Sequence, residues 1–220
     1  MLVNMADEFV QAFIETGWML GIATFFSIVV GVPLGVFLFV TSEGMFWQNR
    51  IVQSIAGTTI NIIRSLPYII LLVLLIPLAK ALLGTSTGPT AASVSLVFAG
   101  IPFYARLVES ALREVDRGVI EAAESCGASP WRIIWDVLLP EAKSGMIAGL
   151  TVTVISLLGY SAMAGMIGGG GIGDLAIRYG YHRFQQEVMI ATVIILIIVV
   201  QLIQSVGDRL SKKANKMNVT

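Results

Sequence analysis

The sequence predicts an all-α membrane protein whose single domain, residues 1–220, crosses the bilayer with five helices. Of the 220 residues, 56% are hydrophobic and only 13% are charged, whereas an ordinary soluble domain has about 25% charged residues. Five apolar runs reach the roughly 20 residues that cross a hydrocarbon core. The predicted spans are about 17–40, 55–83, 91–112, 146–167 and 188–206.

The first, third and fourth runs are single spans by their length, and the second is longer than one straight span needs. It contains Arg64 and is interrupted at Pro67 and Pro77. Because proline removes a backbone hydrogen bond and crowds the preceding turn, we expect a tilted or kinked helix that is broken at both prolines. The fifth run consists largely of Val, Ile and Leu, each contributing about −0.3 to −0.6 kcal/mol to insertion, so it inserts unaided.

The distribution of charge predicts how the chain lies in the membrane. Cytoplasmic loops carry an excess of Lys and Arg, and such residues cluster at Arg50, in the segment 106–143 and in the tail 209–216. The first 16 residues have three acidic and no basic side chains. The N-terminus is therefore expected outside and the C-terminus in the cytoplasm. The net charge of zero excludes a polybasic nucleic-acid-binding protein.

A polar segment, reading EAAESCGASPWRIIWDVLLPEA over residues 121–142, lies between the third and fourth runs. The stretch before Gly127 favours a helix, and Gly127 is the expected left-handed residue after its end. Ser129 is a candidate N-cap, and Pro130 suits the first position of a second helix. The pattern predicts a helix, a turn and a second helix.

The second of these helices carries apolar residues at helical spacing, Trp131, Ile134, Trp135 and Leu138, which indicate one apolar stripe. Pro140 is expected to end it. A short amphipathic unit of this kind either lies in the lipid interface or docks on a soluble partner, and the pattern alone favours neither.

The loop between the fourth and fifth runs begins with four glycines and an acidic residue, Gly168, Gly169, Gly170, Gly171 and Asp174. A phosphate-binding loop needs a following Lys and Ser or Thr, and Asp174 stands there instead. We expect the glycines to end the fourth span, so that a short amphipathic piece, 175–179, lies over the outer mouth. A simple flexible turn is the alternative.

The sequence lacks the common motifs for catalysis, nucleotide binding and metal binding. The sequence has no helical HExxH, no GxSxG and no GxxxxGK[ST]. Glu109 is the nearest acidic candidate in a span, and its spacing from Arg106 predicts an i,i+3 ion pair. His182 has no partner at metal-ligand spacing, and the lone Cys126 is expected to be a packing residue on the reducing side. We expect no metal and no cofactor on this chain.

The polar segment is similar to the signature of bacterial ABC importer permeases, in which EAA is followed by a glycine and by a terminal LP. Val137 stands where that signature has Ile, a conservative difference. The resemblance implies a type I importer permease fold, in which this cytoplasmic segment, 118–140, forms coupling helices that seat in a separate ATPase. The implied coupling residues are Glu121, Ala122, Ala123, Gly127, Ser129, Pro130, Trp131, Leu139 and Pro140.

Four further stretches, NIIRSLPYIILLVLLIP, LLGYSAMAG, GGGGIGDL with a following YGY, and LIQSVGDRL, resemble the permeases of methionine ABC importers. The resemblance implies a multi-pass protein of the bacterial inner membrane that forms a homodimer. It also implies two cytoplasmic ATPase subunits, which carry the ATP and Mg²⁺, and an extracytoplasmic substrate-binding protein. Methionine is the implied cargo, and the glycine loop with Asp174 is expected to dock the binding protein.

A pathway for the cargo is expected along the fourth span. Polar side chains inside a bilayer normally face protein or water, and this span carries Ser156, Tyr160, Ser161 and Met163, of which Ser156, Tyr160 and Met163 fall near one helical face. Aromatic and thioether side chains suit a methionine tail, although packing inside the bundle is the plainer interpretation. Arg64 would cost about 2.5–3.5 kcal/mol at a span centre, so we expect it at the inner end of the pathway.

Three classes of function are considered for such a chain. An importer permease for methionine is preferred, with another amino acid or small solute as the nearest alternative. A self-sufficient transporter or channel would work without an ATPase, and a membrane-embedded enzyme would need an active site. Dependence of uptake on ATP hydrolysis by a partner separates the first two classes.

Overall fold

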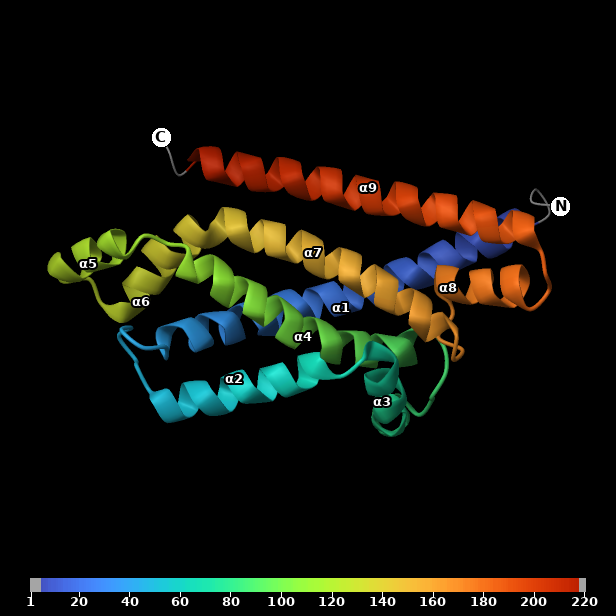
Figure 1. The fold of residues 1–220 in the computed structure, drawn as a ribbon, viewed down its shortest axis with the longest axis horizontal. Helices are drawn as coiled ribbons and strands as arrows, with labels where there is room; N and C mark the ends of the chain where they lie inside the picture. The colour runs from blue at the N-terminus through green and yellow to red at the C-terminus, as the bar shows by residue number, and fades with distance from the viewer. Residues whose placement is uncertain (1–4, 218–220) are drawn as a thin grey trace.

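The structure is a computed structural model that describes residues 5–217. The first four and last three residues of the predicted domain, including the N-terminal end assigned above to the outside, lie outside the described residues. Between residues 5 and 217 the secondary structure is helical, and the long helices run side by side as an elongated bundle (Figure 1). The elements are α1 (Ala6–Val40), α2 (Arg50–Ser65), α3 (Tyr68–Leu83), α4 (Pro89–Arg113), α5 (Arg117–Ser125), α6 (Pro130–Arg132), η2 (Ile133–Leu138), α7 (Leu139–Gly165), α8 (Gly171–Leu175), η3 (Ala176–Tyr181) and α9 (Gln186–Met217), where η2 and η3 are π-helical.

The short elements gather at the two ends of the bundle. We call the end that carries α5, α6 and η2 the α5 end, and the opposite end the α8 end (Figure 1). Among the described residues, four helices are long and apolar enough to cross a membrane: α1, α4, the run from α6 through α7, and α9. The bent pair α2–α3 makes a fifth crossing if it counts as one span.

The second apolar run forms two helices rather than one kinked helix. The axes of α2 and α3 differ by 104°. Leu66, just before Pro67, is extended at φ −75° and ψ 129°, as the proline ring demands of its neighbour. Pro77 lies inside α3 and does not break it, so the expected break there is wrong. Membrane helices tolerate proline where neighbouring groups satisfy the freed carbonyl.

The core of the bundle forms where α4 packs between α1 and α7. The side chains of Met19, Leu96 and Leu157 contribute from the three helices and are fully buried or nearly so. Helices α1 and α4 approach closely because Gly35 has no side chain: a Cβ there would lie 2.6 Å from the carbonyl oxygen of Ala105. Close approach through small residues is the usual way that membrane helices gain packing energy.

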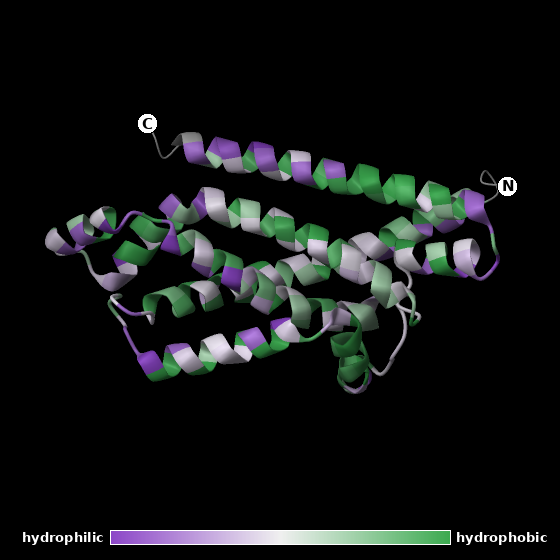
Figure 2. Ribbon diagram, viewed as in Figure 1, coloured by the Kyte–Doolittle hydropathy of each residue, from purple (hydrophilic) through white to green (hydrophobic). Residues whose placement is uncertain are grey.

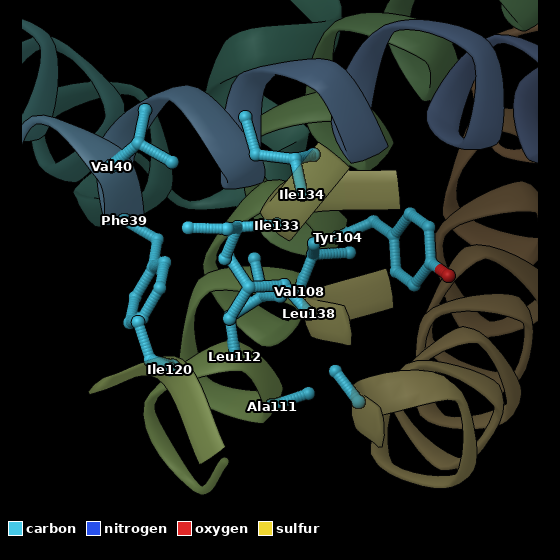
Figure 3. Packing of buried hydrophobic residues seen from close by; sticks show 11 residues of the cluster. Phe39, Val40, Tyr104, Val108, Ala111, Leu112, Ile120, Ile133, Ile134 and Leu138 are labelled. Carbon is cyan, nitrogen blue, oxygen red and sulfur yellow. The ribbon is translucent and has the colours of Figure 1, made fainter. Parts of the chain in front are cut away.

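A second buried cluster fixes the short elements to the α5 end. Phe39 of α1 and Val108 of α4 meet Ile120 of α5 and Ile133 and Leu138 of η2 in this cluster (Figure 3). The segment between α4 and α7 is thus packed onto the bundle by apolar contact. It does not hang free as a loop.

The last helix, α9, lies along α7 and changes character along its length. Its first half is strongly hydrophobic and its final turns are polar (Figure 2). Near the polar end, the Ser144 hydroxyl lies 3.0 Å from the Ser211 carbonyl, and the Ser211 hydroxyl lies 3.0 Å from the Ser144 carbonyl. Gly207 lies directly against Thr151, whose side chain occupies the space that a Cβ would need.

Candidate functional site

The turn after α5 is a Schellman motif built on a glycine. The backbone N–H of Ala128 donates to the carbonyl of Ala123 at 3.1 Å, and the N–H of Gly127 donates to that of Glu124 at 2.9 Å. Gly127 has φ +78°, which confirms the predicted left-handed residue. A Cβ at this position would meet nothing within 4 Å, so the requirement for glycine is conformational and not steric.

The start of each short helix is also defined locally. Ser129 occupies the N-cap position and Pro130 the first helical position, as predicted, although the Ser129 side chain makes no capping hydrogen bond. Asp116 caps α5, because its Oδ1 accepts the Gly118 N–H at 2.7 Å. We did not predict this cap, although an Asp directly before a helix is its usual signal. Cys126 is exposed, which corrects its assignment as a packing residue.

The π-helical segment η2 divides the predicted apolar stripe between two faces. Ile134 and Leu138 are buried against α1 and α4 (Figure 3), whereas Trp131 and Trp135 are 61% and 65% exposed. The prediction of a single stripe is therefore wrong. The i→i+5 hydrogen bonds of a π-helix widen each turn, so residues spaced for one α-helical face separate onto two.

An exposed aromatic surface results at the α5 end. Trp47, from the connection between α1 and α2, packs edge-on against Trp131 with ring centroids 5.1 Å apart. Exposed tryptophan is a frequent anchor of protein interfaces. Of the predicted coupling residues, the exposed ones are Glu121, Ala122, Gly127, Ser129, Trp131 and Pro140, and the partly buried ones are Ala123, Pro130 and Leu139.

Pro140 does not end the second helix, contrary to the prediction. The helix runs from Pro130 to Gly165, 36 residues, through η2 and into α7. Across the π turn the Leu139 N–H donates to the Ile134 carbonyl. Pro140 has no N–H to donate, and a widened turn before it relieves the contact between its ring and the preceding carbonyls. The exposed tryptophan surface and the fourth span therefore belong to one helix.

A cavity of about 100 Å³ lies where α2 and α3 meet α4 and α7. Arg64 and Tyr160, both predicted for the pathway, line it together with Tyr68 and Phe103. The Tyr68 and Tyr160 rings stack with centroids 4.5 Å apart, and the Arg64 guanidinium lies 5.6 Å from the Phe103 centroid. The remaining lining residues are Ile63, Leu66, Leu71 and Ala99.

The other predicted pathway residues do not line this cavity. Ser161 is buried and its hydroxyl donates to the Leu158 carbonyl at 2.8 Å. Ser156 donates in the same way to the Val152 carbonyl at 2.9 Å. Met163 is 42% exposed on the outside of the single chain. Tyr68 and Phe103 were not predicted, because only the tertiary packing of α3 and α4 brings them to Tyr160.

An ion-pair network ties α4 to α2 beside the cavity. The predicted pair is confirmed: Arg106 Nη1 lies 2.6 Å from Glu109 Oε2, and Arg113 Nη2 lies 2.8 Å from the other carboxylate oxygen. Arg106 also donates to the Gly57 carbonyl at 2.9 Å and to Asn61 Oδ1 at 3.0 Å. Because Glu109 is almost completely buried, both arginines are needed to offset the removal of its charge from water.

The glycine segment at the α8 end is packed against α1. Glu15 Oε2 accepts the Gly171 N–H at 2.7 Å, and Thr16 Oγ1 accepts the Ile172 N–H at 2.9 Å. These two bonds satisfy N–H groups at the start of α8. The segment is therefore an ordered connection and not a simple flexible turn. Of the predicted docking residues, Gly168 is exposed, Gly170 and Asp174 are partly buried, and Gly169 and Gly171 are buried.

A polar cavity of about 260 Å³ lies beside this segment. Glu8, Glu15, Asp174 and Arg178 line it, and Arg178 pairs with Asp174 at 2.8 Å. The adjacent Glu8 carboxylate, which accepts a hydrogen bond from the Tyr179 hydroxyl, raises the pKa of Tyr179. Within residues 5–217 no group of three or more His, Cys, Asp or Glu side chains is arranged to hold a metal ion.

Known proteins are similar to this chain in sequence and in fold over most of their length. A probable D-methionine transport system permease of Vibrio cholerae is 46% identical over 210 residues, which cover 96% of this chain and 93% of that protein. A methionine import system permease of Bacillus subtilis is 48% identical over 179 residues, 81% of each chain. A solved inward-facing MetNI methionine ABC transporter matches with a TM-score of 0.94 and 42% identity, covering 96% of this chain and 98% of that one.

A solved amino acid ABC transporter matches with a TM-score of 0.75 but only 22% identity, and so supports the fold alone. The family model of binding-protein-dependent transport system inner membrane components matches residues 27–216. That range contains the Schellman turn, the cavity and the ion-pair network described above. The chain belongs to the family of binding-protein-dependent transport system inner membrane components.

Proposed function

We propose that this chain is the permease subunit of an ATP-driven methionine importer. Two relatives named as methionine permeases and a solved methionine ABC transporter cover 81–96% of the chain at 42–48% identity, which supports methionine over another amino acid. The proposed assembly contains two copies of this chain, two cytoplasmic ATPase subunits and an extracytoplasmic binding protein. The chain itself carries no catalytic step in this scheme, because ATP hydrolysis belongs to the partner.

The observation that carries the proposed mechanism is the continuous helix from Pro130 to Gly165. It holds the exposed Trp131 at one end and the cavity residue Tyr160 near the other. An ATPase that docks on the segment 118–140 can thereby act on the cavity through one continuous helix. We place the α5 end in the cytoplasm and the α8 end outside, where the glycine segment and Asp174 face the binding protein.

The cavity supplies groups that match the carboxylate and the thioether of methionine. The Arg64 guanidinium suits the carboxylate, and the stacked Tyr68 and Tyr160 rings offer aromatic surface to the thioether. At about 100 Å³, however, it is sized for a few water molecules, each of which takes about 30 Å³. Room for the whole substrate therefore requires either a helix movement or a contribution from the second chain. In the second case the exposed Met163 faces that second chain.

Reconstitution tests this function directly. The chain is placed in proteoliposomes with its ATPase and its binding protein, and uptake of radiolabelled methionine is measured with ATP, without ATP and with a hydrolysis-deficient ATPase. Uptake is expected only in the first case, and excess unlabelled methionine should compete better than other amino acids. Equal uptake without ATP and with the hydrolysis-deficient ATPase would overturn the proposal in favour of a self-sufficient transporter, and stronger competition by a different amino acid would reassign the cargo.

A further inference from the structure

An apolar groove of about 360 Å³ runs between α7 and α9 near the α5 end. Ile147, Leu150 and Val154 line it from α7, and Leu202, Val206 and Leu210 line it from α9. The lining spans eight residues of α7, Ile147 to Val154, or roughly 10 Å along the helix. The groove keeps its apolar lining although the opposite side of α9 is already polar at the same height along the helix, where Gln204 and Asp208 are hydrogen-bonded to each other.

Two lysines continue the groove beyond its apolar lining. Lys143 lies four residues before Ile147 and Lys213 three residues after Leu210, so each shares a helical face with the groove. Both side chains are exposed. The reciprocal hydrogen bonds of Ser144 with Ser211 hold the two helices together at this level and bring the two lysines to the same end of the groove.

The groove lies on the side of α7 opposite to the proposed pathway. Ile147, Leu150 and Val154 share one helical face, and Ser156, Tyr160 and Met163 fall roughly on the other side of the helix. If the second copy of the chain completes the pathway, as the proposed function requires, then it packs against the side of α7 that carries Tyr160. The groove, on the other side of α7, then faces the lipid.

We propose that this groove binds an anionic phospholipid of the cytoplasmic leaflet. One acyl chain lies along the apolar lining, and the phosphate lies between Lys143 and Lys213. The cytoplasmic leaflet supplies anionic headgroups, and basic side chains at a membrane surface attract them. The orientation is that of the proposed function, but lipid binding depends neither on the cargo nor on the ATPase, so the two ideas fail separately.

Native mass spectrometry of the purified full-length chain tests the site. Phosphatidylglycerol and phosphatidylcholine with identical acyl chains are titrated against wild type, K143Q/K213Q and K212Q. Lys212 carries the same charge at the same level but lies on another face of α9, so K212Q is the matched control. Wild type and K212Q should prefer phosphatidylglycerol, and the double variant should bind it about 30-fold more weakly, as two lost lysine contacts imply.

A bulky residue in the groove tests the acyl chain. V206W should weaken the binding of both lipids, whereas V193W, another exposed position of α9 outside the groove, should not. An equal loss in K212Q would overturn the site in favour of diffuse attraction, as would the absence of a preference for phosphatidylglycerol in wild type. Self-crosslinking of V206C in a C126S background would assign the groove to a second copy of the chain instead.

Discussion

Among single residues, Gly127 has the most specific requirement. Gly127 has a φ of +78°, and no atom lies within 4 Å of the place where a Cβ would be. A side chain at this position would therefore strain the backbone without colliding with a neighbour. Gly127→Val should cost about 1–2 kcal/mol in local conformation, too little to unfold the bundle but enough to re-aim α5 relative to α6. We expect a variant that inserts and dimerises normally but co-purifies poorly with its ATPase, or allows ATP hydrolysis without transport.

Gly127→Asn is the matched control, because Asn adopts the left-handed conformation more readily than β-branched residues. It should retain most ATPase binding in the same co-purification and most methionine uptake. Wild-type binding and wild-type uptake in Gly127→Val would refute the coupling role as argued.

The cavity gives a second prediction for single side chains. Tyr160→Ala removes the ring that stacks on Tyr68 and should raise the KM for methionine uptake, more so when combined with Met163→Ala. Tyr160→Phe keeps the ring and should behave almost as wild type. Uptake kinetics in proteoliposomes measure the effect, with ATPase co-purification as the check on assembly. Unchanged kinetics in the double variant would reduce both residues to packing.

The Gly127 turn could be predicted from sequence, and the cavity could not be. The turn is set by residues adjacent in the chain, a helix end, a glycine and a Ser-Pro pair, so the local pattern contains the whole signal. The stack on Tyr160 needs Tyr68 from a helix that turns by 104° after Leu66. That angle depends on tertiary packing, which a local pattern does not express.

For the helices, the crossing of α1 with α4 yields a stability prediction. Gly35→Ala would bring a Cβ to 2.6 Å from the backbone carbonyl of Ala105, and such overpacking typically costs about 1–3 kcal/mol. Gly21→Ala, on the same helix, meets nothing within 4 Å and should be neutral or stabilising by up to about 1 kcal/mol. The midpoint of thermal unfolding in detergent should fall for the first and not for the second. A fall of equal size in both would contradict the close-packed crossing.

The three prolines in question show why helix boundaries were harder to predict than helix positions. Proline has a fixed local effect, the loss of one donor and a clash with the preceding turn, but its outcome depends on the surroundings. At Pro67 the chain turns sharply, at Pro77 α3 continues, and before Pro140 a π turn absorbs the misfit. Hydropathy therefore located the apolar runs, while only the packed structure shows where each helix bends.

For the molecule as a whole, the orientation in the membrane can be tested with a thiol that is already present. Cys126 is exposed at the α5 end of the single chain, so a membrane-impermeant maleimide should label the wild-type chain, expressed without its ATPase, in inside-out vesicles and not in intact spheroplasts. In a C126S background, S86C should label from the outside and K212C from the inside. Labelling of both new cysteines from the outside would show that five crossings is the wrong number.

The unbroken helix from Pro130 to Gly165 also acts as a lever. Within its α-helical part, α7, Leu139 and Tyr160 are 21 residues apart, or about 32 Å at 1.5 Å per residue. If the α5 end is the pivot, a tilt of only about 7° moves Tyr160 sideways by roughly 4 Å, more than the width of a water molecule and close to the present 4.5 Å spacing of the tyrosine stack. An angular change too small to disturb the buried cluster at the pivot is thus magnified at the far end into a displacement that separates two aromatic rings.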